Sequence, residues 1–146
     1  MGKMRFANLP ERVTAGAFIL YAGLGKLKAD EEHAAGVHGM AKGTYPVLDS
    51  MDPVQFTRAL GASEVALGGA LLLPSVGDGL AGLALTAFAG SLLGLYLKTP
   101  GMRKEGSLAP SQQGTGIAKD VWLLGIGLGL LADSARCRGR RHGAGE

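Results

Sequence analysis

The sequence predicts an all-α protein whose four helices cross a lipid bilayer and pack as one membrane-embedded four-helix bundle. Four stretches contain no charged residue, or only one, and they cover residues 13–25, 59–77, 79–97 and 121–132. As a helix, the stretch 79–97 would rise about 28 Å, close to the roughly 30 Å of a hydrocarbon core. Segments that cross a bilayer must satisfy their own amides, and these stretches lack the alternating pattern of barrel strands. Helices are therefore the predicted spans.

Glycine is the second unusual feature, with 25 residues in a chain of 146. The usual share is about 7%, and a soluble helix loses about 1 kcal/mol for each glycine that replaces alanine. Membrane helices tolerate glycine because small residues let their backbones approach closely. We expect the glycines at packing intervals to form the seams of the bundle, with a homodimer face on the third helix as the alternative. These glycines are Gly16 and Gly23, Gly61 and Gly68, Gly82, Gly90 and Gly94, and Gly125 and Gly129.

A single transmembrane domain over residues 1–146 is expected to hold the four helices. The predicted helices cover residues 10–29, 55–73, 80–98 and 115–134, with a polar loop over 30–53 and a basic C-terminal tail over 135–146. A cleaved signal peptide is the rival interpretation of the first apolar segment. The junction after Leu27 is a poor cleavage site, however, and three further apolar segments follow it.

Four spans would bring both termini to the same side of the plasma membrane, as a multi-pass protein. Lysine and arginine divide almost evenly between the two sides, so their number alone does not set the orientation. The dense arginine cluster directly after the last helix favours termini in the cytoplasm. The same cluster predicts contact with anionic lipid of the bilayer, and no nucleic-acid partner is expected.

Glu64 is the one charge inside the second apolar stretch, about 12 Å along its helix. An unpaired carboxylate at such a depth costs about 3 kcal/mol, so it should face the bundle interior and have a partner. On the first helix, Arg12 and Lys26 share a face with the glycines, and this face predicts that the Lys26 ammonium reaches Glu64. Lys119 and Asp120 open the fourth helix in the same half of the membrane. The candidate polar core therefore consists of Glu64, Lys26, Arg12, Lys119 and Asp120.

Two interpretations of this polar core stay open. The first is a buried ion pair that fixes the order of the helices. The second is a polar site for a lipid-soluble ligand such as a quinone headgroup, or a proton relay. Exchange of Glu64 for glutamine separates them, since loss of activity with normal folding supports a functional site.

Metal binding and nucleophilic catalysis find little support in the sequence. His33 and His38 lie five residues apart, so they point about 140° apart around a helix, and no cysteine joins them. No metal site is therefore expected. The chain shows no arrangement of a nucleophile with a base, and whether it is an enzyme stays open.

Three short motifs point to a known family by their order and spacing. They are Arg12-x3-Gly16-x-Phe18-x4-Gly23-x2-Lys26-Leu27, then Glu64-x3-Gly68-Gly69-Ala-Leu71-Leu72-Leu73, and finally Lys119-Asp120-Val-Trp122-Leu-Leu124-Gly125. In these motifs the chain resembles the DoxX family of small bacterial four-helix membrane proteins. The resemblance implies a plasma-membrane protein whose relatives include a subunit of a thiosulfate:quinone oxidoreductase. It also implies that the five candidate residues form the polar core of the family, although this chain has no cysteine pair for thiol chemistry.

The leading functional hypothesis is an accessory or quinone-interacting membrane subunit that partners a redox enzyme, with quinone as the one cofactor considered. The first alternative is a small proton-coupled transporter, because four-helix drug antiporters use a single membrane-embedded glutamate. In those proteins the glutamate belongs to the first helix, whereas Glu64 belongs to the second. The other alternative is a structural assembly factor without catalysis.

Overall fold

The computed structural model describes residues 3–143, and this part of the chain is helical without a β-strand. The predicted all-α class is therefore confirmed. The long helices are α1 (Leu9–Leu27), α3 (Pro53–Leu72), α4 (Asp78–Lys98) and α6 (Val121–Gly143). The shorter elements are η1 (Phe6–Asn8), α2 (Glu31–Thr44), η2 (Pro46–Ser50) and α5 (Thr115–Ala118).

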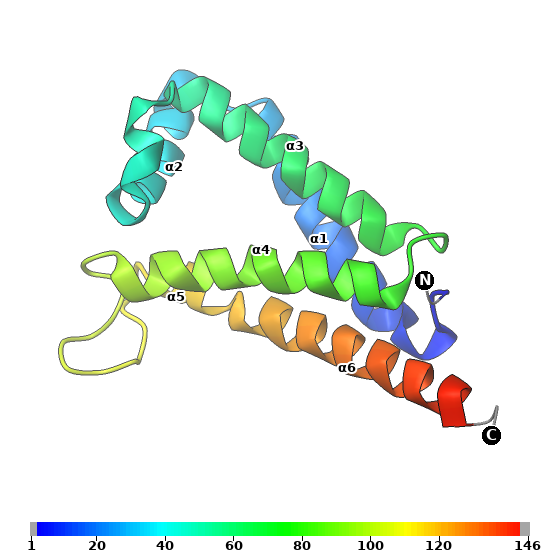
Figure 1. The fold of residues 1–146 in the computed structure, drawn as a ribbon. Coiled ribbons are helices and arrows are strands. Elements are labelled where there is room, and N and C mark those ends of the chain that lie inside the picture. The colour runs from blue at the N-terminus through cyan, green and yellow to red at the C-terminus, as the bar shows by residue number, and fades with distance from the viewer. Residues whose placement is uncertain (1–2, 144–146) are drawn as a thin grey trace.

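The four long helices form two pairs arranged as a V (Figure 1). Helix α1 packs along α3, and α4 packs along α6. The two pairs meet at the turn that joins α3 to α4 and diverge toward the opposite end, where α2 lies across the opening. The first described element, η1, and the last turns of α6 both lie at the closed end of the V.

The seam between α1 and α3 is built from glycine against glycine. A Cβ atom added to Gly23 would lie 2.7 Å from the Gly61 carbonyl oxygen, and one added to Gly61 would lie 2.8 Å from that of Gly23. Gly68 meets Gly16 in the same way, with 2.8 Å between an added Cβ and the Gly16 oxygen. These approaches leave no room for a side chain, so the predicted packing role of these four glycines is confirmed.

In the second pair, Gly82 of α4 faces Gly127 of α6, with 2.9 Å between a Cβ on Gly82 and the Gly127 oxygen. The prediction that Gly125 and Gly129 form the seam is wrong, because both face open space. Each lies two residues from Gly127, which corresponds to a rotation of about 200° around the helix. The face that α6 turns toward α4 is thus the opposite one. Gly90, also expected in a seam, has no neighbour either.

Residues 30–53 were expected to form a polar loop, and this expectation is wrong, since α2 and η2 occupy most of the segment. Helix α2 begins at a strong capping signal, because the Asp30 carboxylate accepts a hydrogen bond of 2.8 Å from the His33 N–H. Ala34, His38 and Ala41 then form a buried stripe at spacings of four and three. This stripe packs α2 against α3 and explains why the segment folds as a helix.

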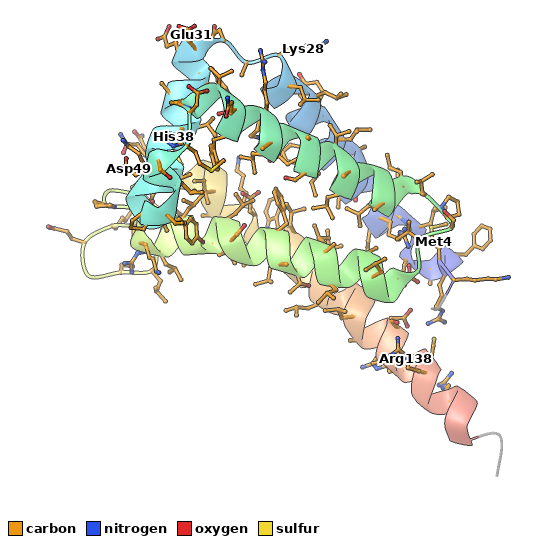
Figure 2. All side chains as sticks on the ribbon, turned by 45° about the horizontal axis from the view of Figure 1, so that its top comes forward. Met4, Lys28, Glu31, His38, Asp49 and Arg138 are labelled. Carbon is orange, nitrogen blue, oxygen red and sulfur yellow. The ribbon has the colours of Figure 1, made fainter. Side chains whose placement is uncertain are left out.

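The end of the chain also differs from the prediction. The expected helix 115–134 is divided into α5 and α6 by a tight turn in which the N–H groups of Asp120 and Trp122 bond three residues back. The predicted basic tail continues α6 as helix through Gly143. Figure 2 shows Arg138 on this extension, far from His38 and Glu31 at the other end of the molecule.

Two helical segments are long and apolar enough to cross a membrane, namely Asp78–Lys98 and Thr115–Arg140. Little of either is covered by the protein itself. Only 28% of the most apolar stretch of the first, and 17% of that of the second, is buried.

Candidate functional site

A cavity of about 1010 Å³ occupies the open end of the V, between the two helix pairs and beneath α2. All six α-helices and the α5–α6 junction contribute to it, and most of its walls are apolar or aromatic. In Figure 2 the side chains of the diverging pairs point into this space. The apolar lining includes Phe18, Ile19, Val37, Met40, Phe56, Leu60, Phe88, Leu92, Leu95, Ile117 and Leu123. The ionisable lining consists of Lys26, Asp30, Glu32, His33, Glu64 and Asp120.

Lys26 and Glu64 form an ion pair in the wall of this cavity, with 2.9 Å between Nζ and Oε2. The Glu64 side chain is 5% exposed and that of Lys26 is 21% exposed. The predicted approach of the Lys26 ammonium to Glu64 is therefore confirmed. The glycine seam brings Lys26 within reach of Glu64, because Lys26 lies directly over Gly61. A Cβ added to Gly61 would be 2.9 Å from the Lys26 Cβ.

Asp120 reaches the same cavity from the other helix pair. It occupies the turn between α5 and α6, and it lies close enough to Glu64 and Lys26 for their charges to act on it. Within the described part of the chain its carboxylate accepts no hydrogen bond. The neighbouring Lys119 is exposed and does not line the cavity. Three of the five candidate residues, Lys26, Glu64 and Asp120, are thus brought together, and Lys119 is not.

Arg12, the remaining candidate, lies at the closed end of the V and has no access to the cavity. Its guanidinium is fully buried and donates to Asp78 Oδ1 at 2.7 Å. It also donates four hydrogen bonds of 2.8–3.1 Å to carbonyl oxygens at the end of α3 and in the following turn, those of Ala70, Leu71, Leu73 and Val76. The last carbonyls of a helix lack partners within the helix, and a cation there is favourable. Arg12 therefore acts as a cap that ties α1, α3 and α4 together.

Asp78 was not predicted as a site residue, yet it is the centre of the network at the closed end. Its Oδ2 accepts hydrogen bonds of 3.0 Å from the Arg5 N–H and from the Asn8 amide. Asn8 also donates to Asp133 of α6 at 3.0 Å, and Asp133 pairs with the Arg5 guanidinium. The hydrogen bond to Asp133, together with its charge, raises the pKa of Arg5 above its usual value. The signal in the sequence was an aspartate in the first turn of a helix, directly after a proline and glycine turn.

The two histidines of α2 have different environments. His38 is buried, its Nε2 lies 2.8 Å from the Leu48 carbonyl oxygen, and its ring meets Phe56 edge-on at 5.4 Å between centroids. His38 therefore holds α2 against η2 and α3, whereas His33 is exposed at the cavity mouth. Among the side chains of residues 3–140, which the structure describes, no three of histidine, cysteine, aspartate or glutamate gather in a way that would hold a metal ion.

Comparisons with protein families, characterised proteins and solved structures found no match to this chain.

Proposed function

We propose that this chain is a four-span membrane protein, similar to the DoxX family, whose cavity binds a lipid-soluble ligand of the quinone class. In this proposal α1 and α3 cross the bilayer together with α4 and α6, and the termini face the cytoplasm. The protein acts as an accessory subunit that presents the ligand to a redox enzyme. The observation that carries the proposal is a mostly apolar cavity whose lining includes Lys26, Glu64 and Asp120.

Lipid exposure of α4 and α6 is supported by how little of their apolar surface the protein covers. A soluble protein rarely leaves such long apolar helices uncovered, because large apolar patches are sites of association. On α1, Tyr21 is 79% exposed and Leu24 is 45% exposed. The charges that interrupt α1 do not oppose a span, since Arg12 and Lys26 both pair with carboxylates inside the protein.

Ligand binding is supported by the size and chemistry of the cavity. Its volume of about 1010 Å³ is at the upper end of the range for small-molecule sites, roughly 300–1,000 Å³. The apolar walls match a hydrocarbon tail and an aromatic ring. An ammonium group carries three N–H donors, and within the described part of the chain Lys26 donates to Glu64 alone, which leaves donors for a quinone carbonyl oxygen.

The proposal is tested by equilibrium binding of a short-tailed quinone to the protein in lipid nanodiscs. Wild type should bind, whereas Ala22→Phe, which places a ring into the cavity, should reduce the affinity at least about tenfold, a loss of about 1.4 kcal/mol. Glu11→Phe, which adds the same ring to the exposed side of α1, is the matched control and should bind as wild type does. Binding of neither the quinone nor its reduced quinol by correctly folded wild type would contradict the proposal.

Partnership with a redox enzyme has its own test. The protein should co-purify from native membranes in mild detergent with a protein that carries a redox cofactor. If the protein is isolated without a redox protein, the proposed accessory role is wrong, while the proposed ligand binding is unaffected.

A proton-coupled transporter is the second candidate, favoured by the two carboxylates of Glu64 and Asp120 in the lining of one cavity. In vesicles this function predicts efflux of a lipophilic substrate that depends on a pH gradient and is lost in Glu64→Gln. Efflux that does not depend on the pH gradient would exclude proton-coupled transport.

A further inference from the structure

The hydrogen-bonding groups at the polar end of the cavity are mostly acceptors. At alkaline pH, where both groups are ionised, the carboxylates of Glu64 and Asp120 together bring four oxygen atoms that only accept hydrogen bonds. Glu64 Oε2 accepts from Lys26, while Glu64 Oε1 and both oxygens of Asp120 accept from no group in residues 3–140. No fully buried side-chain oxygen or nitrogen in this range lacks a partner, so these three oxygens reach accessible space. Both residues line the cavity, and that space is where a ligand would lie.

Donors are scarce at the same place. The Lys26 ammonium is the one cationic donor that lines the cavity beside the two carboxylates, and Glu64 already engages it. Two hydroxyl groups of the lining are committed to the protein, because Tyr45 donates to the Ser91 carbonyl oxygen at 3.0 Å and Ser91 donates to that of Phe88 at 2.7 Å. His33, at the cavity mouth, follows the acidic side chains of Asp30 and Glu32, which add further acceptors.

We propose that this site prefers the reduced, hydroxyl-bearing form of a quinone over the oxidised form. This inference rests on the proposed function, since it specifies which ligand of the quinone class the cavity takes. A quinol donates through two phenolic O–H groups, which match the free oxygens of Glu64 and Asp120. A quinone has only carbonyl acceptors, so Lys26 can satisfy one of them and the other would face a carboxylate without a donor between them.

Asp120 is the residue that determines the preference in this proposal. Glu64 is tied to Lys26 in either state of the ligand, whereas both oxygens of Asp120 are available. Asp120→Asn keeps the size and places an amide donor where the carboxylate was. The variant should therefore bind the two forms with similar affinity. Asp49→Asn is the matched control, because Asp49 is 70% exposed in its side chain, pairs with Lys42 and does not line the cavity.

The experiment measures the dissociation constants of a short-tailed benzoquinone and of its pre-reduced quinol under anaerobic conditions, with the protein in nanodiscs. A hydrogen bond to a charged group contributes enough for roughly a tenfold difference in affinity. Wild type and Asp49→Asn should bind the quinol about tenfold more tightly than the quinone, and the ratio for Asp120→Asn should approach one.

Each outcome decides a different point. Equal or tighter binding of the quinone by wild type would overturn the preference and leave the proposed function in place. Binding of neither form by folded wild type would overturn both. If Asp120→Asn lowers the melting temperature, the ratio measured for wild type still decides the preference. If folded Asp120→Asn keeps the wild-type ratio of quinone to quinol dissociation constants, Asp120 does not determine the preference.

Discussion

Arg12 and Asp78 form an ion pair with side chains that are 0% and 3% exposed, at the point where the two helix pairs meet. The pair joins the first helix to the start of α4, and the remaining donors of Arg12 hold the end of α3. Because α1 lies along α3 and α4 lies along α6, this contact anchors one pair to the other. It therefore helps to set how far the pairs diverge and how wide the cavity becomes at the opposite end.

Loss of the carboxylate at this point should be strongly destabilising. In Asp78→Asn the buried Arg12 guanidinium keeps its charge without a counter-ion, and breaking a buried pair in this way costs about 3–5 kcal/mol. Thermal unfolding in detergent measures the effect. The control is Asp49→Asn, which breaks an exposed pair and should change stability by less than about 1 kcal/mol. Equal melting temperatures for the two variants would contradict the role assigned to Arg12.

The glycine seam between α1 and α3 predicts a contrast between two neighbouring positions. Gly23→Ala places a Cβ 2.7 Å from the Gly61 oxygen and should cost about 1–3 kcal/mol, because the helices must separate. Gly25→Ala, two residues later, enters open space and should be neutral or stabilising by up to about 1 kcal/mol. The measurement is thermal unfolding of the two variants side by side. The packing is refuted if Gly23→Ala is the more stable of the two.

The same comparison on α6 tests which face of that helix packs against α4. Gly127→Ala should destabilise, since an added Cβ would lie 2.9 Å from the Thr86 backbone nitrogen and against its hydroxyl group. Gly129→Ala should have little effect on the monomer because nothing lies within 4 Å. Size-exclusion chromatography of Gly129→Ala adds a second readout. If Gly129→Ala changes the oligomeric state, Gly129 does pack against a helix, but that helix belongs to a second copy of the chain.

The ion pair of Lys26 and Glu64 has two interpretations that a double variant separates. Lys26→Met alone leaves the Glu64 carboxylate buried without a partner and should cost about 3–5 kcal/mol. The combined change Lys26→Met with Glu64→Leu should recover most of that stability, because an apolar replacement of a buried pair is often neutral. Ligand binding should remain lost in the double variant. If the double variant recovers both stability and ligand binding, the ion pair of Lys26 and Glu64 has a structural role only.

Part of this arrangement could be predicted from the sequence because it follows from local spacing. Glu64 lies deep in an apolar stretch and needs a partner. Lys26 shares the helix face of Gly16 and Gly23 that packs against the helix of Glu64, so the contact between Lys26 and Glu64 was foreseeable. The partner of Arg12 was not foreseeable, because Asp78 lies between two apolar stretches, in a segment where Pro74, Gly77 and Gly79 indicate a turn.

Other features depend on contacts that local spacing does not specify. The glycines of α6 occur on both faces of the helix, so the pattern alone did not show that Gly127 faces α4. Helix α2 contains several glycines that favoured a loop, but its capped start at Asp30 and its buried stripe outweigh them. The V itself was not expected, because the angle between the pairs depends on contacts between different helices, such as the network around Asp78, rather than on any one helix.

The proposed lipid-soluble ligand and the proposed exposure of helices to lipid both depend on membrane integration. It is tested most directly by extraction of native membranes with alkaline carbonate followed by high-speed centrifugation. If the helices span the bilayer, the protein stays in the membrane pellet and is released only by detergent. Recovery of a folded monomer in the aqueous supernatant would contradict it.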